Sequence, residues 1–312
     1  MVNLPPPFIS FSLLLSLLSA CSNSGSDAQK SAKKSEPKAT LDKGVTPPLD
    51  DANPAGDLGY GDDARLFASA SLAIAHIIKS HPQGVPQVLG FGEFHKLNSS
   101  APVRSALRQF AGGILDLIGP ATSDLVLESW TVDPNCGRTA DVVKKQVEKT
   151  IERPPETENE MAMLVRKVKA LGIQGHALEF QCDEYKRLLV DGKLDHAKVL
   201  TAVSAKLGTS AKGLLDSGDK SKMIVVYGGA THNNISPYEG LESWSYAPEI
   251  AKITNNGFIE IDLYVPEFAE GDELLKTEAW YPLLKEARKD QVILIRRESH
   301  SYILLLRKDF AE

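Results

Sequence analysis

The sequence predicts an α/β fold: a single domain over residues 64–312 with a largely parallel central sheet, helices on both faces and a C-terminal β-hairpin. Short apolar runs of strand length alternate with longer stretches of helical apolar spacing, an order that produces crossover connections between parallel strands. Several runs are apolar at nearly every position, which is typical of strands covered on both faces. A composition of 42% hydrophobic and 24% charged residues indicates a globular chain with a substantial core.

An apolar run at residues 8–18 precedes the domain. It has the length of a signal-peptide core and is too short to span a bilayer as a mature helix. The run leads into L-S-A-C at residues 18–21, which resembles the lipobox of bacterial lipoproteins. The resemblance implies a signal peptide over residues 1–20, cleavage before Cys21 and attachment of lipid to that cysteine.

Residues 21–63 are rich in Ser, Lys, Asp, Gly and Pro and hold too little apolar surface to offset the entropy of ordering. We expect a disordered tether between the lipidated Cys21 and the domain, so that the lipid holds the protein at a membrane. The predicted location is extracytoplasmic, and Ser22 favours the outer membrane by analogy with enterobacterial sorting. The formal net charge of −6 is spread along the chain, so no nucleic-acid partner is expected.

Apolar residues at helical spacing predict six helices in the domain. The first is stopped by His81-Pro82 and the second by Gly119-Pro120, because proline cannot continue a helix. Two prolines at 154–155 separate the third helix from the fourth. The expected helices cover residues 64–80, 101–118, 139–152, 157–171, 194–215 and 272–288.

Five short apolar runs predict the strands of the sheet, and two further runs on either side of a turn predict the terminal hairpin. In open α/β sheets, ligands bind at the carboxyl ends of the strands, so polar residues at those ends are candidates for a site. The expected strands cover residues 85–91, 124–128, 172–180, 223–227 and 258–264, and the hairpin covers 292–296 and 302–307.

Four of these strand ends carry acids, imidazoles or amides, namely Glu93 with His95, Glu128 with Trp130, Glu179, and His232 with Asn233 and Asn234. Two imidazoles and up to three carboxylates in one cleft have two chemical uses. His95, His232 and Glu93 can ligate a divalent metal (Mn, Co or Zn) that activates a water. Alternatively, a carboxylate raises the basicity of a histidine, which then deprotonates water or a substrate hydroxyl without a metal.

The tetrapeptide Gly92-Glu93-Phe94-His95 resembles the G-E-x-H motif of the ChaN-like and erythromycin esterase-like proteins, and it is a variant of the G-x-x-H motif of the Tiki/TraB group. Glu128 ends its strand where these families place an acid. Arg104 follows His95 by nine residues, similar to the spacing of a site arginine in the esterases. Residues 228–232 (G-G-A-T-H) resemble the late strand–Gly–His element of the group, so the resemblance covers most of residues 85–264.

The resemblance implies roles for the cleft residues. His95 would be the general base or a metal ligand, and His232 would be a second base, acid or ligand. Glu93 and Glu128 would orient or ligate, and Arg104 would bind an anionic or carbonyl group of the substrate. A ChaN-like function would instead mean capture of haem by the cleft. Supporting positions around these groups are expected for Glu179, Asn233 and Trp130.

The remaining histidines and the absence of several motifs limit which residues form the site and which class of hydrolase is expected. The remaining histidines lie within or at the ends of predicted elements and are not assigned to the site: His76, His81, His176, His196 and His300. The sequence has no G-x-S-x-G motif, Walker loop, dinucleotide fingerprint or H-E-x-x-H motif. These absences argue against a serine hydrolase of the common α/β type.

Cys136 and Cys182 follow the second and third predicted strands. If those strands are neighbours, the two thiols face each other across the rim, and outside the cytoplasm this favours a disulfide. The bond would close a loop of about 45 residues and stabilise the domain by roughly 3–4 kcal/mol according to the loop-entropy relation. A soft metal site or a nucleophilic thiol is the alternative.

The sequence therefore predicts a lipid-anchored extracytoplasmic protein whose two-histidine cleft hydrolyses an ester, lactone or peptide bond of a small-molecule or peptide substrate. A second hypothesis is a lipoprotein that binds haem or a metal ion without catalysis. A third is an inactive scaffold whose cleft residues only hold loops. The oligomeric state is not predicted.

Overall fold

The computed structural model describes residues 63–97, 100, 102–131, 136–137, 142–143, 145–146, 154 and 156–307, together with the backbone of Leu14–Leu15. The signal peptide, the lipidated Cys21, the linker and the helix expected at 139–152 lie wholly or largely outside these residues. In the described part of the chain, no helix has the length and apolar character needed to cross a membrane.

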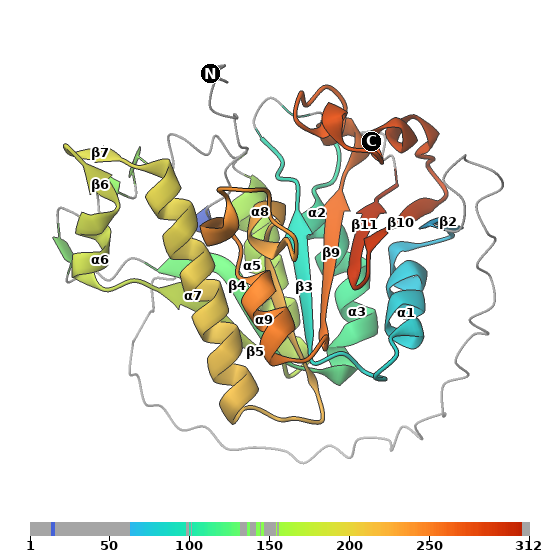
Figure 1. Ribbon diagram of the computed structural model, residues 1–312, viewed down its shortest axis with the longest axis horizontal. Helices are drawn as coiled ribbons and strands as arrows, with labels where there is room; N and C mark the ends of the chain where they lie inside the picture. The colour runs from blue at the N-terminus through green and yellow to red at the C-terminus, as the bar shows by residue number, and fades with distance from the viewer. Residues whose placement is uncertain are drawn as a thin grey trace, which may run out of the picture.

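The domain has the predicted α/β fold, built on a nine-stranded and mostly parallel sheet (Figure 1). The strands lie in the order β5-β4-β8-β3-β9-β11-β10-β2, and β1 pairs with the end of β4. Neighbours from β5 to β11 run parallel, whereas β10 is antiparallel to both β11 and β2. The bounds are β1 Leu14–Leu15, β2 Ala64–Phe67, β3 Val88–Glu93, β4 Thr122–Thr131, β5 Gln174–Glu179, β8 Met223–Gly229, β9 Phe258–Tyr264, β10 Val292–Glu298 and β11 Ser301–Leu305.

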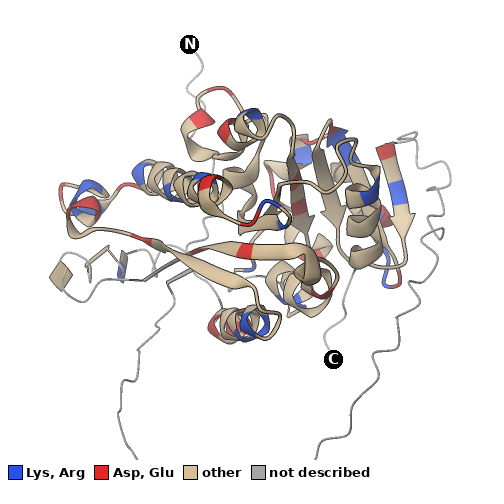
Figure 2. Ribbon diagram, turned by 90° about the horizontal axis from the view of Figure 1, so that it is seen from below, with Lys and Arg blue, Asp and Glu red and all other residues tan. Residues whose placement is uncertain are grey.

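Helices cover both faces of the sheet because alternate residues of each strand point to opposite sides. Leu89 and Phe91 of β3 pack on one face, with α1 (Ala70–Ser80), α2 (Ala106–Gln109), α3 (Leu115–Ile118) and α5 (Glu156–Ala170). Val88 points to the other face, where α7 (His196–Ser217) and α9 (Ala247–Ile253) pack (Figure 1). Basic and acidic residues are intermingled on the helices (Figure 2).

The helix expected at residues 64–80 is wrong in its first turn. Ala64–Phe67 form the edge strand β2, paired with β10. The helix begins only after Ser69, whose hydroxyl accepts a hydrogen bond from the Leu72 N–H at 3.2 Å. A stretch of only four residues cannot be assigned to strand or helix by periodicity, and pairing with the distant hairpin decides it.

The helix expected at residues 272–288 is also wrong. Two short 3-10 helices, η6 (Leu275–Thr277) and η7 (Tyr281–Glu286), take its place. Pro282 lies in the first turn of η7, where its missing N–H is tolerated, but it would break a continuous α-helix. The apolar residues of this segment, Trp280, Leu283 and Leu284, are buried against the hairpin.

Strands β3 and β8 run further than expected, through their glycines. A Cβ at Gly90 would lie 2.0 Å from Asn233 Oδ1, and a Cβ at Gly92 would lie 2.3 Å from Asp262 Oδ1. These glycines do not end the strand. They are needed because polar side chains from other elements lie directly over it. Glu93 is therefore the last residue of β3 and not part of a loop.

Cys136 and Cys182 form the predicted disulfide, with Cα atoms 4.9 Å apart. Cys182 begins α6 (Cys182–Arg187), which leads into the small hairpin of β6 (Leu189–Val190) and β7 (Lys193–Leu194). The bond joins the segments that follow β4 and β5, and these two strands are paired in the sheet. The disulfide is thus confirmed, and the condition on which it was predicted, that the two strands are neighbours, is met.

Candidate functional site

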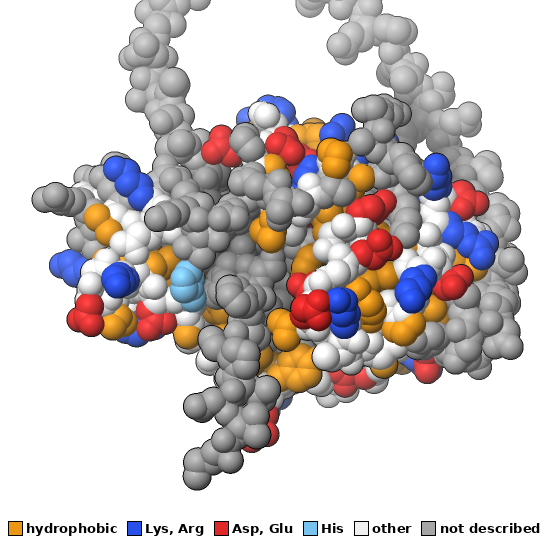
Figure 3. Space-filling view, turned by 90° about the horizontal axis from the view of Figure 1, so that it is seen from above, with side chains coloured by type: hydrophobic (Ala, Val, Ile, Leu, Met, Phe, Trp, Pro, Cys, Tyr) orange, Lys and Arg blue, Asp and Glu red, His pale blue; other side chains and the backbone are white. Residues whose placement is uncertain are grey.

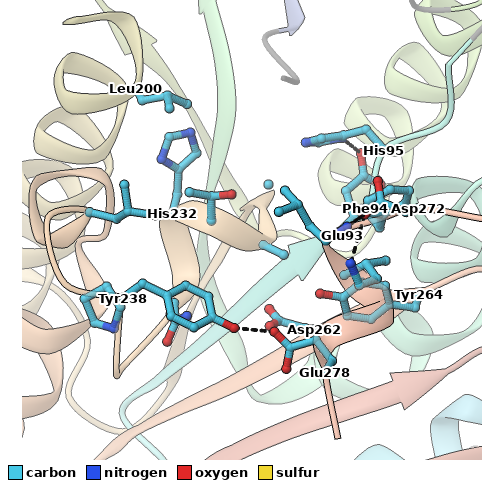
Figure 4. A pocket seen from close by; sticks show the side chains of 18 of the residues that line it. Glu93, Phe94, His95, Leu200, His232, Tyr238, Asp262, Tyr264, Asp272 and Glu278 are labelled. Atoms are coloured by element: carbon cyan, nitrogen blue, oxygen red, sulfur yellow. Dashed lines mark hydrogen bonds and ion pairs between the residues drawn. The ribbon is translucent and has the colours of Figure 1, made fainter. Parts of the chain in front are cut away.

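A cavity of about 440 Å³ lies at the carboxyl ends of the central parallel strands. It is lined by the ends of β3, β4, β8 and β9 and by the short helix α8 (Ala230–Asn233). Two loops border its mouth, and the hydroxyl of Tyr238 on one donates a hydrogen bond to Glu278 on the other (Figure 4). Figure 3 looks down on this end of the molecule, where apolar and acidic side chains lie side by side. The volume is that of a small-molecule pocket.

Glu93 and His95 form a buried pair on one side of the cavity (Figure 4). His95 Nδ1 donates a hydrogen bond to Glu93 Oε1 at 2.5 Å, and the Tyr227 hydroxyl donates to Glu93 Oε2 at 2.5 Å. Tyr227 reaches Glu93 because Phe91 and Tyr227 are register partners of β3 and β8 on the same face. With Nδ1 committed to Glu93, the imidazole presents Nε2 as its second nitrogen.

Glu128 and His232 form a second pair. Glu128 Oε2 accepts a hydrogen bond from the Gly229 N–H at 2.5 Å, and Glu128 Oε1 lies 3.8 Å from His232 Nε2. His232 Nδ1 lies 2.9 Å from the Trp244 carbonyl oxygen and 2.8 Å from Ser204 Oγ. Because a carbonyl can only accept, Nδ1 carries the proton and Nε2 is an acceptor that faces the carboxylate.

His232 is neutral at ordinary pH. Burial lowers the pKa of His232 to about 4, and the hydrogen bond to the Trp244 carbonyl opposes this shift only partly. The contact between His232 Nε2 and Glu128 is therefore between two acceptors, and a hydrogen-bond donor such as water or a substrate N–H can bridge them. We therefore interpret the space between His232 Nε2 and Glu128 Oε1 as a binding position for a hydrogen-bond donor and not as a salt bridge.

Gly229 brings the two pairs together. A Cβ at this position would lie 2.8 Å from His95 Nε2 and 3.4 Å from Glu128 Oε2. At Gly228 a Cβ would lie 2.7 Å from Glu128 Oε2. Both groups thus occupy space above the end of β8 that any side chain would fill. The structure places Glu93, His95, Glu128 and His232 in one cavity, as the sequence predicts.

Two of the predicted site residues lie elsewhere. Arg104 is exposed in the segment before α2 and is not among the residues that line the cavity. Glu179 is exposed at the end of β5, which pairs with the far side of β4 and so ends away from β3 and β9. Placing these two residues at the site was wrong, because the spacing of Arg104 and the chain position of Glu179 do not determine where their segments lie.

The predicted supporting residues have different outcomes. Asn233 is buried, and its amide donates to the Gly90 carbonyl at 2.9 Å and to Asp262 Oδ1 at 3.3 Å. It thereby ties α8 to β3 and β9 directly behind the cavity. Asn234 lines the cavity itself. Trp130 belongs to β4, and its side chain lies outside the described residues.

Three charged residues at or near the cavity were not predicted from the sequence: Glu260, Asp262 and Arg297. Arg297 of β10 bonds to Glu260, and its guanidinium lies 3.6 Å from Asp262 Oδ2. Burial, followed by the neighbouring charge of Asp262, raises the pKa of Glu260, and burial also raises the pKa of Asp262. The signal was present in the strand F-I-E-I-D-L-Y, where two acids occupy alternate positions of a fully buried strand and therefore require partners.

The predicted metal ligands do not fit a metal centre. Both oxygens of Glu93 already accept hydrogen bonds, from His95 and from Tyr227. Among the described residues, no group of three or more His, Cys, Asp or Glu side chains is arranged to hold a metal ion. The geometry is that of two carboxylate–imidazole pairs bordering one cavity, which suits acid–base chemistry.

The low pKa of His232 predicts an acid-sensitive fold. An exposed histidine titrates near 6.5, so between about 6.5 and 4 the unfolded chain binds more protons than the folded one. The free energy of unfolding therefore decreases as the pH is lowered from about 6.5 to about 4, by up to about 3 kcal/mol from this residue. Urea denaturation near pH 7 and about pH 4.5 should show a smaller loss for His232→Gln than for the wild type. His196→Gln, at an exposed position of α7, is the matched control, and equal losses in all three proteins would contradict the prediction.

No protein-family model matches this chain, and no curated protein matches it. Among solved structures, the chain is similar to a type III effector, HopBA1, with a TM-score of 0.40 and 9% sequence identity, over 76% of this chain and 94% of that chain. A likeness of this size carries no conclusion about fold or function.

Proposed function

We propose that this protein is a hydrolase that cleaves an ester, lactone or peptide bond by general-base catalysis without a metal. The observation that carries the proposal is the buried Glu93–His95 pair at the edge of the cavity. In this geometry His95 Nε2 takes a proton from water as the water oxygen adds to the substrate carbonyl carbon. Glu93 stabilises the imidazolium that forms, and Tyr227 holds the carboxylate in place.

The second pair has a positioning role in this proposal. Glu128 and neutral His232 present two acceptors 3.8 Å apart at the cavity. Such a pair orients a group with hydrogens to donate, either the attacking water or an N–H or O–H of the substrate. Correct orientation of reactants is itself a large part of the rate enhancement in hydrolases.

The cavity favours a substrate with an apolar body. Leucines from three segments line it, namely Leu200, Leu241, Leu274 and Leu275, together with the rings of Phe94, Tyr238 and Tyr264. The two carboxylate–imidazole pairs lie at the strand ends and on α8, and Asp272, Thr277 and Glu278 add polar groups from the loops. This lining supports a small molecule or a peptide side chain held by apolar contacts with its scissile bond near the two pairs.

A panel of simple esters tests the hydrolase. The purified chain is expected to hydrolyse para-nitrophenyl butyrate at a rate that a chelator such as EDTA leaves unchanged. Loss of activity with EDTA, restored by Mn, Co or Zn, would replace the metal-free mechanism with a metal-dependent one. Titration with haemin tests the binding alternative: a Soret band that His95→Ala or His232→Ala abolishes, without ester hydrolysis, would support haem capture.

We also propose that the chain is a lipoprotein anchored outside the cytoplasm through Cys21. The lipobox-like residues 18–21 support this, and so does the Cys136–Cys182 disulfide, since disulfides persist mainly in extracytoplasmic compartments. Expression in a bacterial host with radiolabelled palmitate is expected to label the full chain and to leave Cys21→Ala unlabelled. An unlabelled wild type in the membrane-free fraction would contradict the anchor.

A further inference from the structure

The cluster of Glu260, Asp262 and Arg297 borders the cavity, and the general-base step makes no use of it. Glu260 and Asp262 are fully or almost fully buried on one face of β9. Asp262 and Arg297 line the cavity, whereas Glu260 lies behind them. Burying two carboxyls and a guanidinium lowers the stability of the fold, which suggests that these groups have a role at the cavity.

Asp262 lies on β9, the strand paired with the one that carries the proposed base, and lines the same cavity. Asp262 is the register partner of Gly92, the residue before Glu93, and its Oδ1 takes the space that a Cβ of Gly92 would fill. Asn233 holds the same oxygen through a hydrogen bond of 3.3 Å. Figure 4 shows Asp262 among the cavity residues together with Glu93, His95 and His232. Its carboxyl group is thus fixed at the strand end next to the one that carries the base.

The two carboxyls hold a proton between them. Glu260 and Asp262 are both buried and face a single guanidinium, that of Arg297. Two ionised carboxylates against one cation would leave an uncompensated buried charge, so one of the two carboxyls is protonated. Arg297 offsets the remaining negative charge. The Ile235 N–H also donates to Glu260 Oε2 at 2.9 Å, which fixes the inner carboxyl. The cluster is therefore a neutral unit with an exchangeable proton at the cavity wall.

Hydrolysis needs such a proton. When the bond to the leaving group breaks, an alkoxide or amide anion is too basic to depart unprotonated, and an acid in the site must protonate it. Neutral His232 has its one ring proton on Nδ1, which is bonded to the Trp244 carbonyl and faces away from Glu128. The imidazolium that forms at His95 is one acid of the cavity, on the side of the attacking water, and the proton of the Glu260–Asp262 pair is a second acid at the wall beside β9.

We propose that Asp262 is a further catalytic residue, the general acid that protonates the leaving group, and that Glu260 supplies its proton. This inference rests on the hydrolase function proposed above. Water adds to the carbonyl carbon and gives one proton to His95. The carbon–oxygen or carbon–nitrogen bond then breaks, its electron pair stays on the leaving atom, and that atom takes the proton of Asp262. The proton on His95 returns through solvent to the carboxyl pair, so protons and charge balance over the cycle.

Two esters with the same acyl group test the role of Asp262. Ethyl butyrate has a poor leaving group that needs an acid, whereas para-nitrophenyl butyrate has a good one that does not. Asp262→Asn is expected to lower kcat for ethyl butyrate by about 100-fold or more and kcat for para-nitrophenyl butyrate by less than about 5-fold. Glu278→Gln is the matched control, because Glu278 is also a carboxylate of the cavity but lies at the mouth. It should not separate the two esters.

The outcomes distinguish this inference from the function on which it rests. If the wild type hydrolyses neither ester, the proposed hydrolase fails. If the wild type is active and Asp262→Asn lowers both rates by the same factor, Asp262 is not the acid and the inference is overturned. Circular dichroism and urea denaturation verify the fold of the variant. Should Asp262→Asn not fold, Glu260→Gln replaces it. Glutamine has the size of glutamate and its oxygen can still accept from Arg297 or the Ile235 N–H, but it supplies no proton, so the same selective loss on ethyl butyrate is expected.

Discussion

His95→Gln is expected to lower kcat for ester hydrolysis by about a thousandfold, the usual contribution of a general base. Glutamine has roughly the length of histidine and can still bond to Glu93, but it cannot accept a proton from water. The hydrogen bond of 2.5 Å between His95 and Glu93 and the position of both residues at the cavity are the reasons for the large effect. Steady-state kinetics on para-nitrophenyl butyrate measure it directly.

His176→Gln is the matched control for that experiment. His176 Nε2 lies 2.7 Å from Asp124 Oδ1, so it is also a carboxylate-paired histidine at paired strands of the sheet. It does not line the cavity, and its replacement should leave kcat within about threefold of the wild type. If His95→Gln keeps more than about a tenth of the wild-type kcat, the Glu93–His95 pair is not the base.

Arg297→Met is expected to lower the free energy of unfolding by about 3–5 kcal/mol near pH 8. Arg297 faces both Glu260 and Asp262, and its removal leaves a buried carboxyl pair without its cation. The loss should shrink near pH 5. Burial raises the pKa of both carboxyls, and the charge of Asp262 raises that of Glu260 further, so the folded variant takes up protons as the pH falls and then needs no cation. Urea denaturation at the two pH values measures both effects.

Arg296→Met is the matched control: it shows how much the free energy of unfolding falls when an arginine of the same strand that does not face the buried carboxyls is removed. Arg296 is the preceding residue of β10, and its guanidinium is paired with Asp63 at 2.6 Å on the exposed side of the strand. Exposed pairs contribute little, so the expected change is below about 1 kcal/mol at both pH values. Equal destabilisation by the two substitutions would show that the buried carboxyls do not depend on Arg297.

The sequence was sufficient to predict the parts of the site that follow from local pattern. Apolar runs gave the central strands, and the polar residues just beyond them proved to share one cavity, as with His95 after β3 and His232 after β8. The disulfide between Cys136 and Cys182 was predicted on the condition that β4 and β5 are neighbours, and both the bond and the pairing are present. In each case the relevant contact lies near the end of a strand whose neighbours are parallel.

Sheet order and long-range pairing explain the failures. Glu179 ends a strand as Glu93 does, but β5 lies at the outer side of β4 and no local feature of the sequence reveals this. Arg297 reaches the site only because the terminal hairpin pairs β11 with β9, which brings together Glu260 and Arg297, 37 positions apart in the chain. Tertiary pairing also decided that Ala64–Phe67 became a strand, which periodicity over four residues cannot do.

The glycines of β3 and β8 restrict how the sequences of related proteins can vary. Gly90, Gly92, Gly228 and Gly229 each leave room for one polar group, respectively Asn233, Asp262, Glu128 and His95. A side chain at any of these glycines would displace its partner, so neither member of a pair can change alone without loss of the arrangement. In chains that share this site, we expect each glycine and its partner to be inherited together. Four such pairs, spread over the sequence, would identify distant relatives more securely than the tetrapeptide around His95.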